Sequence, residues 1–216
     1  MDNEYLDGFF KRFNELEYLR DDIQNAFSIL KTCFELNSTL FVCGNGGSAS
    51  DSEHIVGELM KGFLLPRKVK DKKLIDSLNN KFGNDGESIV GYLQNGLRAV
   101  SLTGHPGLST AYSNDVSSEM VFAQQLYVLS KTNDILLAIT TSGNSKNVLR
   151  AVQLASALGR KIILLTGESG GKCAEIADCS IKVPSKETYK IQEYHLPIYH
   201  ILCMMLEDYF YGEKSR

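Results

Sequence analysis

The chain has 216 residues, of which 43% are hydrophobic, and this suits a single α/β domain with a substantial core. The formal net charge of −3 and the pI near 5.8 argue against a nucleic-acid-binding protein, because such proteins usually present a basic face. No run of about 18 apolar residues is present and the N-terminus lacks the apolar centre of a signal peptide, so we expect a cytoplasmic protein with no membrane contact.

The first segment is predicted to be helical. Apolar residues recur at steps of three and four from Leu6 to Leu30, which is typical of one amphipathic helix within an N-terminal arm of residues 1–36. Such a long apolar stripe needs a surface to cover it. We expect the arm to pack against other subunits; packing on its own domain is the alternative.

Short apolar strands then alternate with glycine turns and helices. The expected strands are Thr39–Cys43, Ala99–Leu102, Asp134–Thr140, Lys161–Leu165 and Cys179–Val183. The expected helices are one that follows the turn at 44–48 and continues through Phe63, and those over 146–158 and 188–211. This alternation predicts a three-layer α/β/α sandwich with a five-stranded, flavodoxin-like parallel sheet, as one domain over residues 1–216. A ligand should bind beyond the carboxyl ends of the strands. The five cysteines include no C-x-x-C pair, so buried, reduced thiols are expected.

Residues 66–97 interrupt this order as an insertion within the domain. The segment begins with the basic run RKVKDKK and ends in a weakly helical stretch. Connections longer than about 12–15 residues are uncommon and often act as lids, but a solvated loop or linker is the favoured interpretation of a basic run.

Two glycine- and serine-rich turns each follow a strand and precede a helix. The first is Gly44-Asn45-Gly46-Gly47-Ser48, and the second runs from Thr140 to Ser145. Glycines let the backbone approach a ligand, hydroxyls add donors, and a helix N-terminus favours an anion. Neither turn has the G-x-G-x-x-G spacing of a dinucleotide site or a P-loop lysine. Together the turns predict a phosphate site.

Two further sets of residues are candidates for chemistry. His54 and Glu58 lie four residues apart in a predicted helix and so share a face, although a surface pair with a weak interaction would look the same. In the last helix Gln192 and His200 are eight residues apart and face roughly the same way. His195 lies between them, and its ordinary interpretation is a buried core histidine.

Four stretches together carry a family resemblance: FVCGNGGSASDSEHIVGEL, YSNDVSSE, ITTSGNSKNVLRAV and IQEYHLPIYHILC. They resemble the sugar isomerase (SIS) fold family and, within it, the phosphoheptose isomerases. The resemblance covers nearly the whole chain apart from residues 66–97. The family's arginine shortly after the glutamate is replaced here by the Lys61-Gly62 region.

The resemblance implies roles for individual residues. Glu58 and His200 match the catalytic pair, and zinc, one ion per subunit, would be bound by His54, Glu58, Gln192 and His200. Ser142 and Ser145 would bind phosphate. The remaining substrate-binding positions implied are Asn45, Gly46, Gly47, Ser48, Glu58, Asn114, Asp115, Thr140, Thr141 and Gln192.

The resemblance also implies an activity and an assembly. The expected reaction converts sedoheptulose 7-phosphate to D-glycero-D-manno-heptose 7-phosphate, the first step of heptose nucleotide synthesis for lipopolysaccharide or other surface glycans. Glu58 would take the proton from C1 to leave an enediolate, and His200 would act on the oxygen side. Zinc would act as a Lewis acid. The family forms homotetramers with sites at subunit interfaces.

Other functions remain open from the sequence. A non-catalytic SIS protein that binds a replication-initiator partner would share the turns, but it would not need His54, Glu58, Gln192 and His200 together. An isomerase of another sugar phosphate would keep them all. A sugar-phosphate-sensing regulator is disfavoured, because no DNA-binding extension is present.

Overall fold

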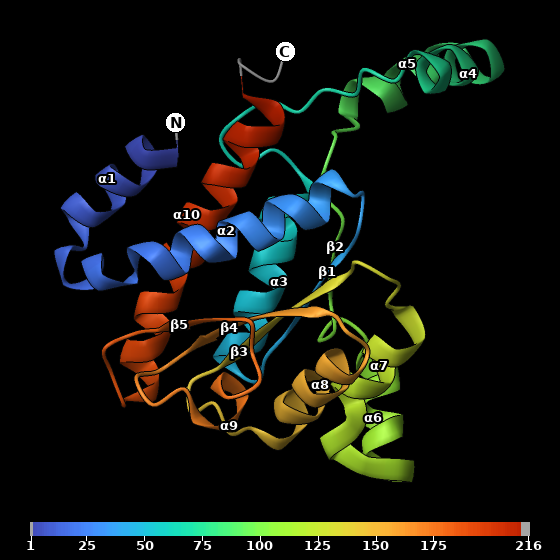
Figure 1. Cartoon of the computed structure of the whole chain (residues 1–216). Helices are drawn as coiled ribbons and strands as arrows, with labels where there is room; N and C mark the ends of the chain where they lie inside the picture. Colours follow the sequence, from blue (N-terminus) through green and yellow to red (C-terminus); the bar gives the residue numbers. More distant parts are fainter. Residues whose placement is uncertain (1, 213–216) are drawn as a thin grey trace.

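The computed structural model describes residues 2–212 and places a parallel sheet between two helical layers (Figure 1). The strands are β1 Leu40–Cys43, β2 Ala99–Ser101, β3 Ile135–Thr140, β4 Lys161–Thr166 and β5 Cys179–Lys182. The α-helices are α1 Asp2–Arg12, α2 Arg20–Glu35, α3 Gly47–Met60, α4 Lys72–Phe82, α5 Asn84–Tyr92, α6 Pro106–Tyr112, α7 Val121–Leu129, α8 Lys146–Ala157, α9 Gly171–Ala174 and α10 Thr188–Tyr211. Shorter 3-10 and π turns occupy residues 14–19 and 113–120.

The sheet has the order β2-β1-β3-β4-β5, and every neighbouring pair is parallel. The chain therefore leaves β1 toward β2 at one edge and returns to β3 on the other side of β1. The gap between the carboxyl ends of β1 and β3 is the switch point at which such sheets bind ligands. The predicted α/β sandwich is confirmed.

Successive residues of each strand point to opposite faces of the sheet. In β3, Ile135 and Leu137 join a core shared with the N-terminal helices, α3 and α10. Leu136 and Ala138 join a second core formed with α7 and α8. Both faces are covered, which is why β3 reads as a continuous apolar run.

The N-terminal segment differs from the prediction in two ways. It is broken near Phe13 into α1, a 3-10 turn and α2. Its apolar stripe is also already buried on its own domain: Leu6, Ile23 and Leu30 are at most 2% exposed within one core that includes α10. The interpretation of this stripe as a surface for other subunits is wrong, because α10 and the sheet cover it.

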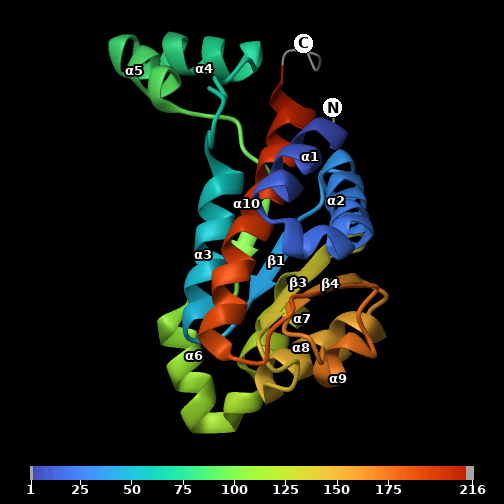
Figure 2. The same ribbon diagram turned by 90° about the vertical axis from the view of Figure 1, so that its left-hand side faces the viewer.

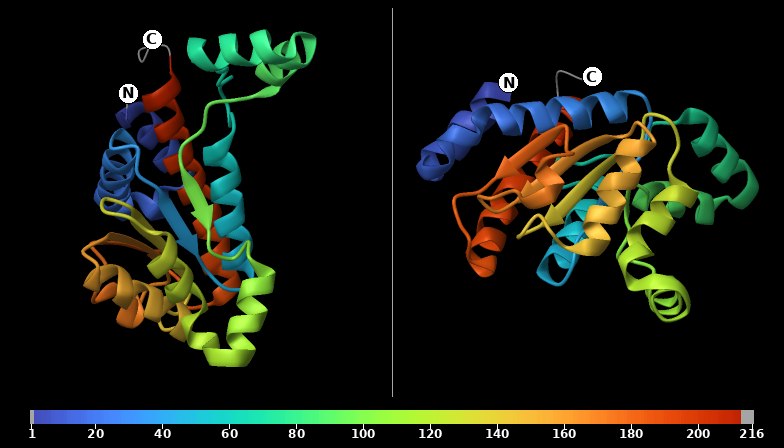
Figure 3. Two further views of the ribbon diagram at one scale, coloured as in Figure 1. Left: turned by 90° about the vertical axis from the view of Figure 1, so that its right-hand side faces the viewer. Right: turned by 60° about the horizontal axis from the view of Figure 1, so that its bottom comes forward.

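The insertion folds into a helical hairpin rather than a loop. Helices α4 and α5 pack on each other and project from the end of α3, away from the sheet (Figures 1 and 3). Asp71 caps α4 by accepting from the N–H groups of Lys73 and Leu74. Asn95 closes the base of the hairpin by donating its backbone N–H to the carbonyl of Arg67 at 2.6 Å.

All five cysteines are buried with free thiols, as the sequence predicts. Burial raises the pKa of Cys33 to about 12, so this thiol is inert at neutral pH. Within residues 2–212, no helix combines the length and the apolar character needed to cross a membrane.

Candidate active site

The first turn joins β1 to α3 at the switch point. Gly46 has a φ of +56°, a region that a side chain disfavours. Gly44 lies so close to the next turn that a Cβ atom would come within 2.5 Å of the Ser48 carbonyl oxygen. Ser48 is buried in the first turn of α3. The glycines are therefore required by the tight path that brings the chain into the N-terminus of α3.

The second turn joins β3 to α8 in the same way. Thr140 is buried and donates its hydroxyl to Oγ of Ser145 at 3.2 Å. Ser145 is the N-cap residue of α8, but its side chain makes no capping hydrogen bond. Ser142 is exposed and accepts from the N–H of Asn144 at 3.2 Å. The turn thus presents hydroxyls at the positive end of a helix, which favours an anion.

The structure brings the two turns together. The side-chain amide of Asn45 donates to Asn147 at 2.8 Å, and Asn147 donates back to Asn45 at 2.9 Å. A hollow beside this pair is lined by Asn45, Ser118, Glu119, Ser145, Lys146 and Asn147. The N-termini of α3 and α8 therefore face one region, as a phosphate site requires.

Asn114 and Asp115 lie in the π turn after α6. Asn114 donates its amide to Asp115 at 2.9 Å, and both side chains are exposed. Gln192 lies on α10 directly against the first turn, since a Cβ atom on Gly47 would be 2.6 Å from Nε2 of Gln192.

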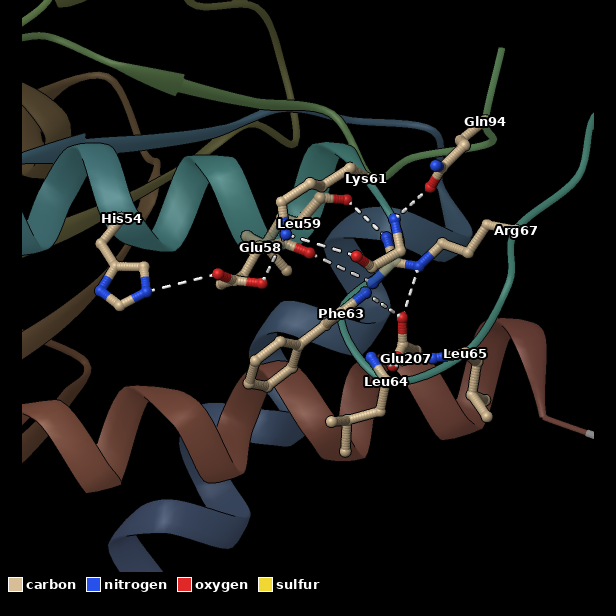
Figure 4. A network of polar contacts seen from close by, with 11 residues as sticks. His54, Glu58, Leu59, Lys61, Phe63, Leu64, Leu65, Arg67, Gln94 and Glu207 are labelled. Carbon is tan, nitrogen blue, oxygen red and sulfur yellow. Dashed lines mark hydrogen bonds and ion pairs between the residues drawn. The ribbon is translucent and has the colours of Figure 1, made fainter. Parts of the chain in front are cut away.

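A second polar cluster lies farther along α3, where this helix runs beside α10 (Figure 2). Glu58 is the centre of the cluster: Oε1 is 3.3 Å from Nε2 of His54, and Oε2 is 3.0 Å from Nζ of Lys61 (Figure 4). The Glu58 side chain is only 12% exposed. The predicted His54–Glu58 pair is therefore a half-buried contact and not a solvated surface pair.

His200 approaches this cluster from α10. Its ring centroid is 5.0 Å from that of His54, and the ring of Phe63 covers it at 5.5 Å. Among the residues that the structure describes, Nε2 of His200 has no hydrogen-bond partner. Burial and the neighbouring His54 lower the pKa of His200, while Glu58 acts in the opposite direction. Burial therefore favours the neutral form of His200, and its Nε2 has no partner that would keep it from acting.

The four predicted zinc ligands are only partly gathered. His54, Glu58 and His200 lie together, whereas Gln192 lies near the first turn. No three His, Cys, Asp or Glu side chains within residues 2–212 are arranged as a metal site. The imidazole and carboxylate donors present are nevertheless of the kind that zinc takes.

Two features of this region were not found from the sequence. Tyr199 lies between His54 and Asp51, with its hydroxyl 3.0 Å from Nδ1 of His54 and 3.2 Å from Oδ1 of Asp51. Glu207 accepts the backbone N–H groups of residues 63–65 and the guanidinium of Arg67. Arg67 in turn donates to the carbonyl of Leu59, so this pair fixes the end of α3 next to Glu58 (Figure 4).

His195 is buried in the core, as expected, and it makes the stability of the protein depend on pH. Burial lowers its pKa from 6.5 to about 4, with a smaller opposing effect from the Thr166 backbone. The unfolded chain therefore binds a proton at a higher pH than the folded chain. The free energy of unfolding should fall as the pH drops from 6.5 to 4, by about 3 kcal/mol if His195 acts alone.

Urea unfolding of the wild type and of His195→Gln between pH 7 and pH 4.5 measures this effect. The variant should show a flatter dependence on pH, because glutamine does not titrate. Parallel curves for the two proteins would contradict the assignment of the effect to His195.

The comparisons with known proteins agree with this geometry. The family model for the SIS domain matches residues 94–206, which include the second turn and His200. The chain belongs to the SIS domain family. It is also 37% identical to phosphoheptose isomerase of Helicobacter pylori (strain P12) over 195 residues, or 90% of this chain and 88% of that protein.

Solved structures agree as well. A phosphoheptose isomerase from Francisella tularensis is 31% identical with a TM-score of 0.72, and the match covers 95% of this chain and 96% of the other. Phosphoheptose isomerase from Neisseria gonorrhoeae is 28% identical with a TM-score of 0.73 and the same coverage. Within the SIS proteins, the chain belongs to the phosphoheptose isomerase family.

Proposed function

We propose that the protein interconverts sedoheptulose 7-phosphate and D-glycero-D-manno-heptose 7-phosphate in the cytoplasm. The observation that carries the proposal is the position of Glu58 next to two imidazoles, of which His200 has a free buried nitrogen. Moving a proton between adjacent carbons needs a base near carbon and an acid near oxygen. Family membership supplies the seven-carbon ketose as the substrate.

The joined turns would bind the phosphate, and the Glu58 cluster would face the reacting carbons. Glu58 follows Gly47 by eleven residues on the same helix, which is about 16 Å along its axis. The site is therefore elongated, with the phosphate-binding turns at one end and the acid–base residues at the other. Binding of the distant phosphate would hold the sugar in register with Glu58.

Glu58 would take the proton from C1, leaving an enediolate, and would return it at C2. Its carboxylate is held at Oε2 by Lys61 at 3.0 Å, and Oε1 lies 3.3 Å from Nε2 of His54. His200 would exchange a proton with the substrate oxygens through its free Nε2. Phe63 covers the His200 ring and would exclude water from this side.

Zinc is part of the proposal, with one ion per subunit that His54, Glu58 and His200 would bind. Gln192, the fourth ligand that the resemblance implies, lies against Gly47 and would have to approach the other three to complete the set. The free Nε2 of His200 and the short distance between His54 and Glu58 support the zinc site. When bound, zinc would polarise the substrate oxygens as a Lewis acid. A carboxylate or imidazole that binds zinc is a weaker base, so for Glu58 and for His200 one of the two roles, ligand or acid–base group, would have to relax during turnover.

We also propose a homotetramer with sites at subunit interfaces, serving the first step of heptose nucleotide synthesis for lipopolysaccharide or other surface glycans. The Glu58 cluster lies at the end of α3 from which the α4–α5 hairpin projects, so a neighbouring subunit could close the elongated site. Light scattering of the purified protein measures the assembly.

A panel of ketose phosphates tests the function. Sedoheptulose 7-phosphate should give an aldose product at a higher kcat/KM than five- and six-carbon ketose phosphates. A chelator should remove the activity and added zinc should restore it. Turnover of only a five- or six-carbon ketose phosphate would mean that sedoheptulose 7-phosphate is not the substrate. No turnover of any ketose phosphate would contradict the proposed isomerase function. Full activity in the presence of the chelator would contradict the zinc site.

A further inference from the structure

A line of four polar side chains connects the interior of α3 to Glu58. Asp51 contacts the hydroxyl of Tyr199 at 3.2 Å, and the same hydroxyl contacts Nδ1 of His54 at 3.0 Å. Nε2 of His54 then lies 3.3 Å from Oε1 of Glu58 (Figure 4). Three of these residues are on α3, and Tyr199 joins them from α10. Tyr199 is 2% exposed, so its hydroxyl is confined to these partners.

The donors along this line can be assigned from their chemistry. A phenol carries one proton, and an ionised carboxylate only accepts. An ordinary phenol is protonated at neutral pH, and the carboxylate of Asp51, 3.2 Å from the Tyr199 hydroxyl, favours that form. The hydroxyl then donates to Asp51. Its oxygen is left as an acceptor, which requires His54 to carry its proton on Nδ1.

A neutral imidazole with its proton on Nδ1 has a lone pair on Nε2. This lone pair faces the carboxylate of Glu58, whose other oxygen is paired with Lys61. Two acceptors 3.3 Å apart repel each other, and the ammonium of Lys61, 3.0 Å from the other oxygen of Glu58, offsets only the charge on its own side. The arrangement suits a divalent cation, because metal-binding histidines usually donate their second N–H to a fixed partner.

We propose that Tyr199 and Asp51 are positioning residues that hold His54 with its proton on Nδ1 and so present a bare Nε2 beside Glu58 to a divalent cation. The tautomer follows from hydrogen bonding within this chain and does not depend on any activity. Its consequence for isomerisation rests on the proposed function. Neither residue contacts the reacting atoms; both act through His54.

Nitrogen-15 NMR of the metal-free, histidine-labelled protein at pH 8 tests the tautomer directly. The chain has four histidines, so a His54→Gln spectrum assigns the signal. The wild type should show His54 protonated on Nδ1. Tyr199→Phe keeps the ring and removes the partner, so the proton should redistribute toward Nε2. Asp51→Ala should move the His54 proton further toward Nε2, because the hydroxyl of Tyr199 no longer donates to Asp51 and can donate to Nδ1 of His54.

Tyr127→Phe is the matched control, because Tyr127 is 65% exposed on α7 and its change should leave the His54 signal unaltered. A wild-type His54 protonated on Nε2, or an unchanged tautomer in Tyr199→Phe, would overturn the proposal. These outcomes are independent of turnover, so they are distinguishable from failure of the proposed function.

Zinc binding to the same proteins, measured by competition with a chelating dye, tests the cation. Tyr199→Phe should weaken zinc binding by about 10–100-fold, the usual effect of losing such a partner. If the proteins are active, kcat should fall by a similar factor. Equal zinc affinity in wild type and Tyr199→Phe would overturn the role of Tyr199 and Asp51 in cation binding.

Discussion

Replacement of Glu58 by glutamine is expected to lower the kcat for isomerisation by about 10²–10⁴-fold, the range that a positioned acid–base group contributes. Glutamine has the shape of glutamate and can still contact His54 and Lys61, but it cannot accept a proton from carbon. The KM should change little, because the turns that would bind the phosphate lie about 16 Å away along α3. The loss should therefore appear in kcat.

Two measurements separate this loss from misfolding. Thermal unfolding of Glu58→Gln should match that of the wild type within a few degrees. In D₂O the wild type should place deuterium on the substrate carbons, and the variant should not. Glu53→Gln is the matched control: it makes the same change on the same helix, where Glu53 accepts from the hydroxyl of Thr103 at 3.0 Å. Near-normal activity of Glu58→Gln would remove Glu58 from its role as the base.

The sheet was predictable because its signals are local. The strand at Ile135–Thr140 is buried at every position, so the sequence has an uninterrupted apolar run between turn residues. The turns that follow β1 and β3 could be paired from the sequence alone, because the carboxyl ends of parallel strands meet at one edge. The 24-residue α10 was also expected at its observed bounds, and it continues through Pro197.

Other parts of the fold gave no local signal. The break near Phe13 contains no glycine or proline, and its apolar spacing continues across the 3-10 turn. The two helices of the insertion have no large buried side chain: in α4 no residue is buried, and in α5 only Gly86 is. The charged residues therefore gave the segment the appearance of a solvated loop. Even so, Asp71 is the N-cap residue and Gly83 the C-cap residue of α4.

The site was predicted at the level of residue types but not of their partners. His54 and Glu58 share a helical face, which the sequence alone implies. Tyr199 contacts residues about 145 positions away, and no pattern within one helix indicates such a pair. Arg67 belongs to a basic run that reads as solvated, yet it is 2% exposed because its charge is paired with Glu207.

Replacement of Glu207 by leucine is expected to lower the free energy of unfolding by about 3–5 kcal/mol, the cost of leaving one partner of a buried ion pair alone. The side chains of Arg67 and Glu207 are 0% and 2% exposed and lie 2.8 Å apart. Leucine fits the space but leaves the buried guanidinium of Arg67 without a charged partner. It also removes the acceptor of three backbone N–H groups, of residues 63, 64 and 65.

The companion variant Arg67→Met should lower the free energy of unfolding by less than Glu207→Leu does. Glu207 then keeps its three backbone donors. The carbonyls of Leu59 and Glu58 lose the guanidinium, but Leu59 still accepts from the N–H of Leu97. The double variant should recover part of the loss caused by Glu207→Leu, because no buried positive charge remains unpaired. The double variant should remain less stable than the wild type, since the three backbone N–H groups are still without an acceptor.

Urea unfolding followed by circular dichroism, at one protein concentration because assembly shifts apparent stability, measures these differences. Glu193→Leu makes the same change on the exposed face of α10 and should lie within about 0.5 kcal/mol of the wild type. Arg67 also donates to the backbone carbonyl of Glu58 at 3.2 Å, so a variant that loosens the Arg67–Glu207 pair should also lower kcat in the protein that remains folded. A Glu207→Leu protein as stable as the Glu193→Leu control would mean that the end of α3 is held by other contacts.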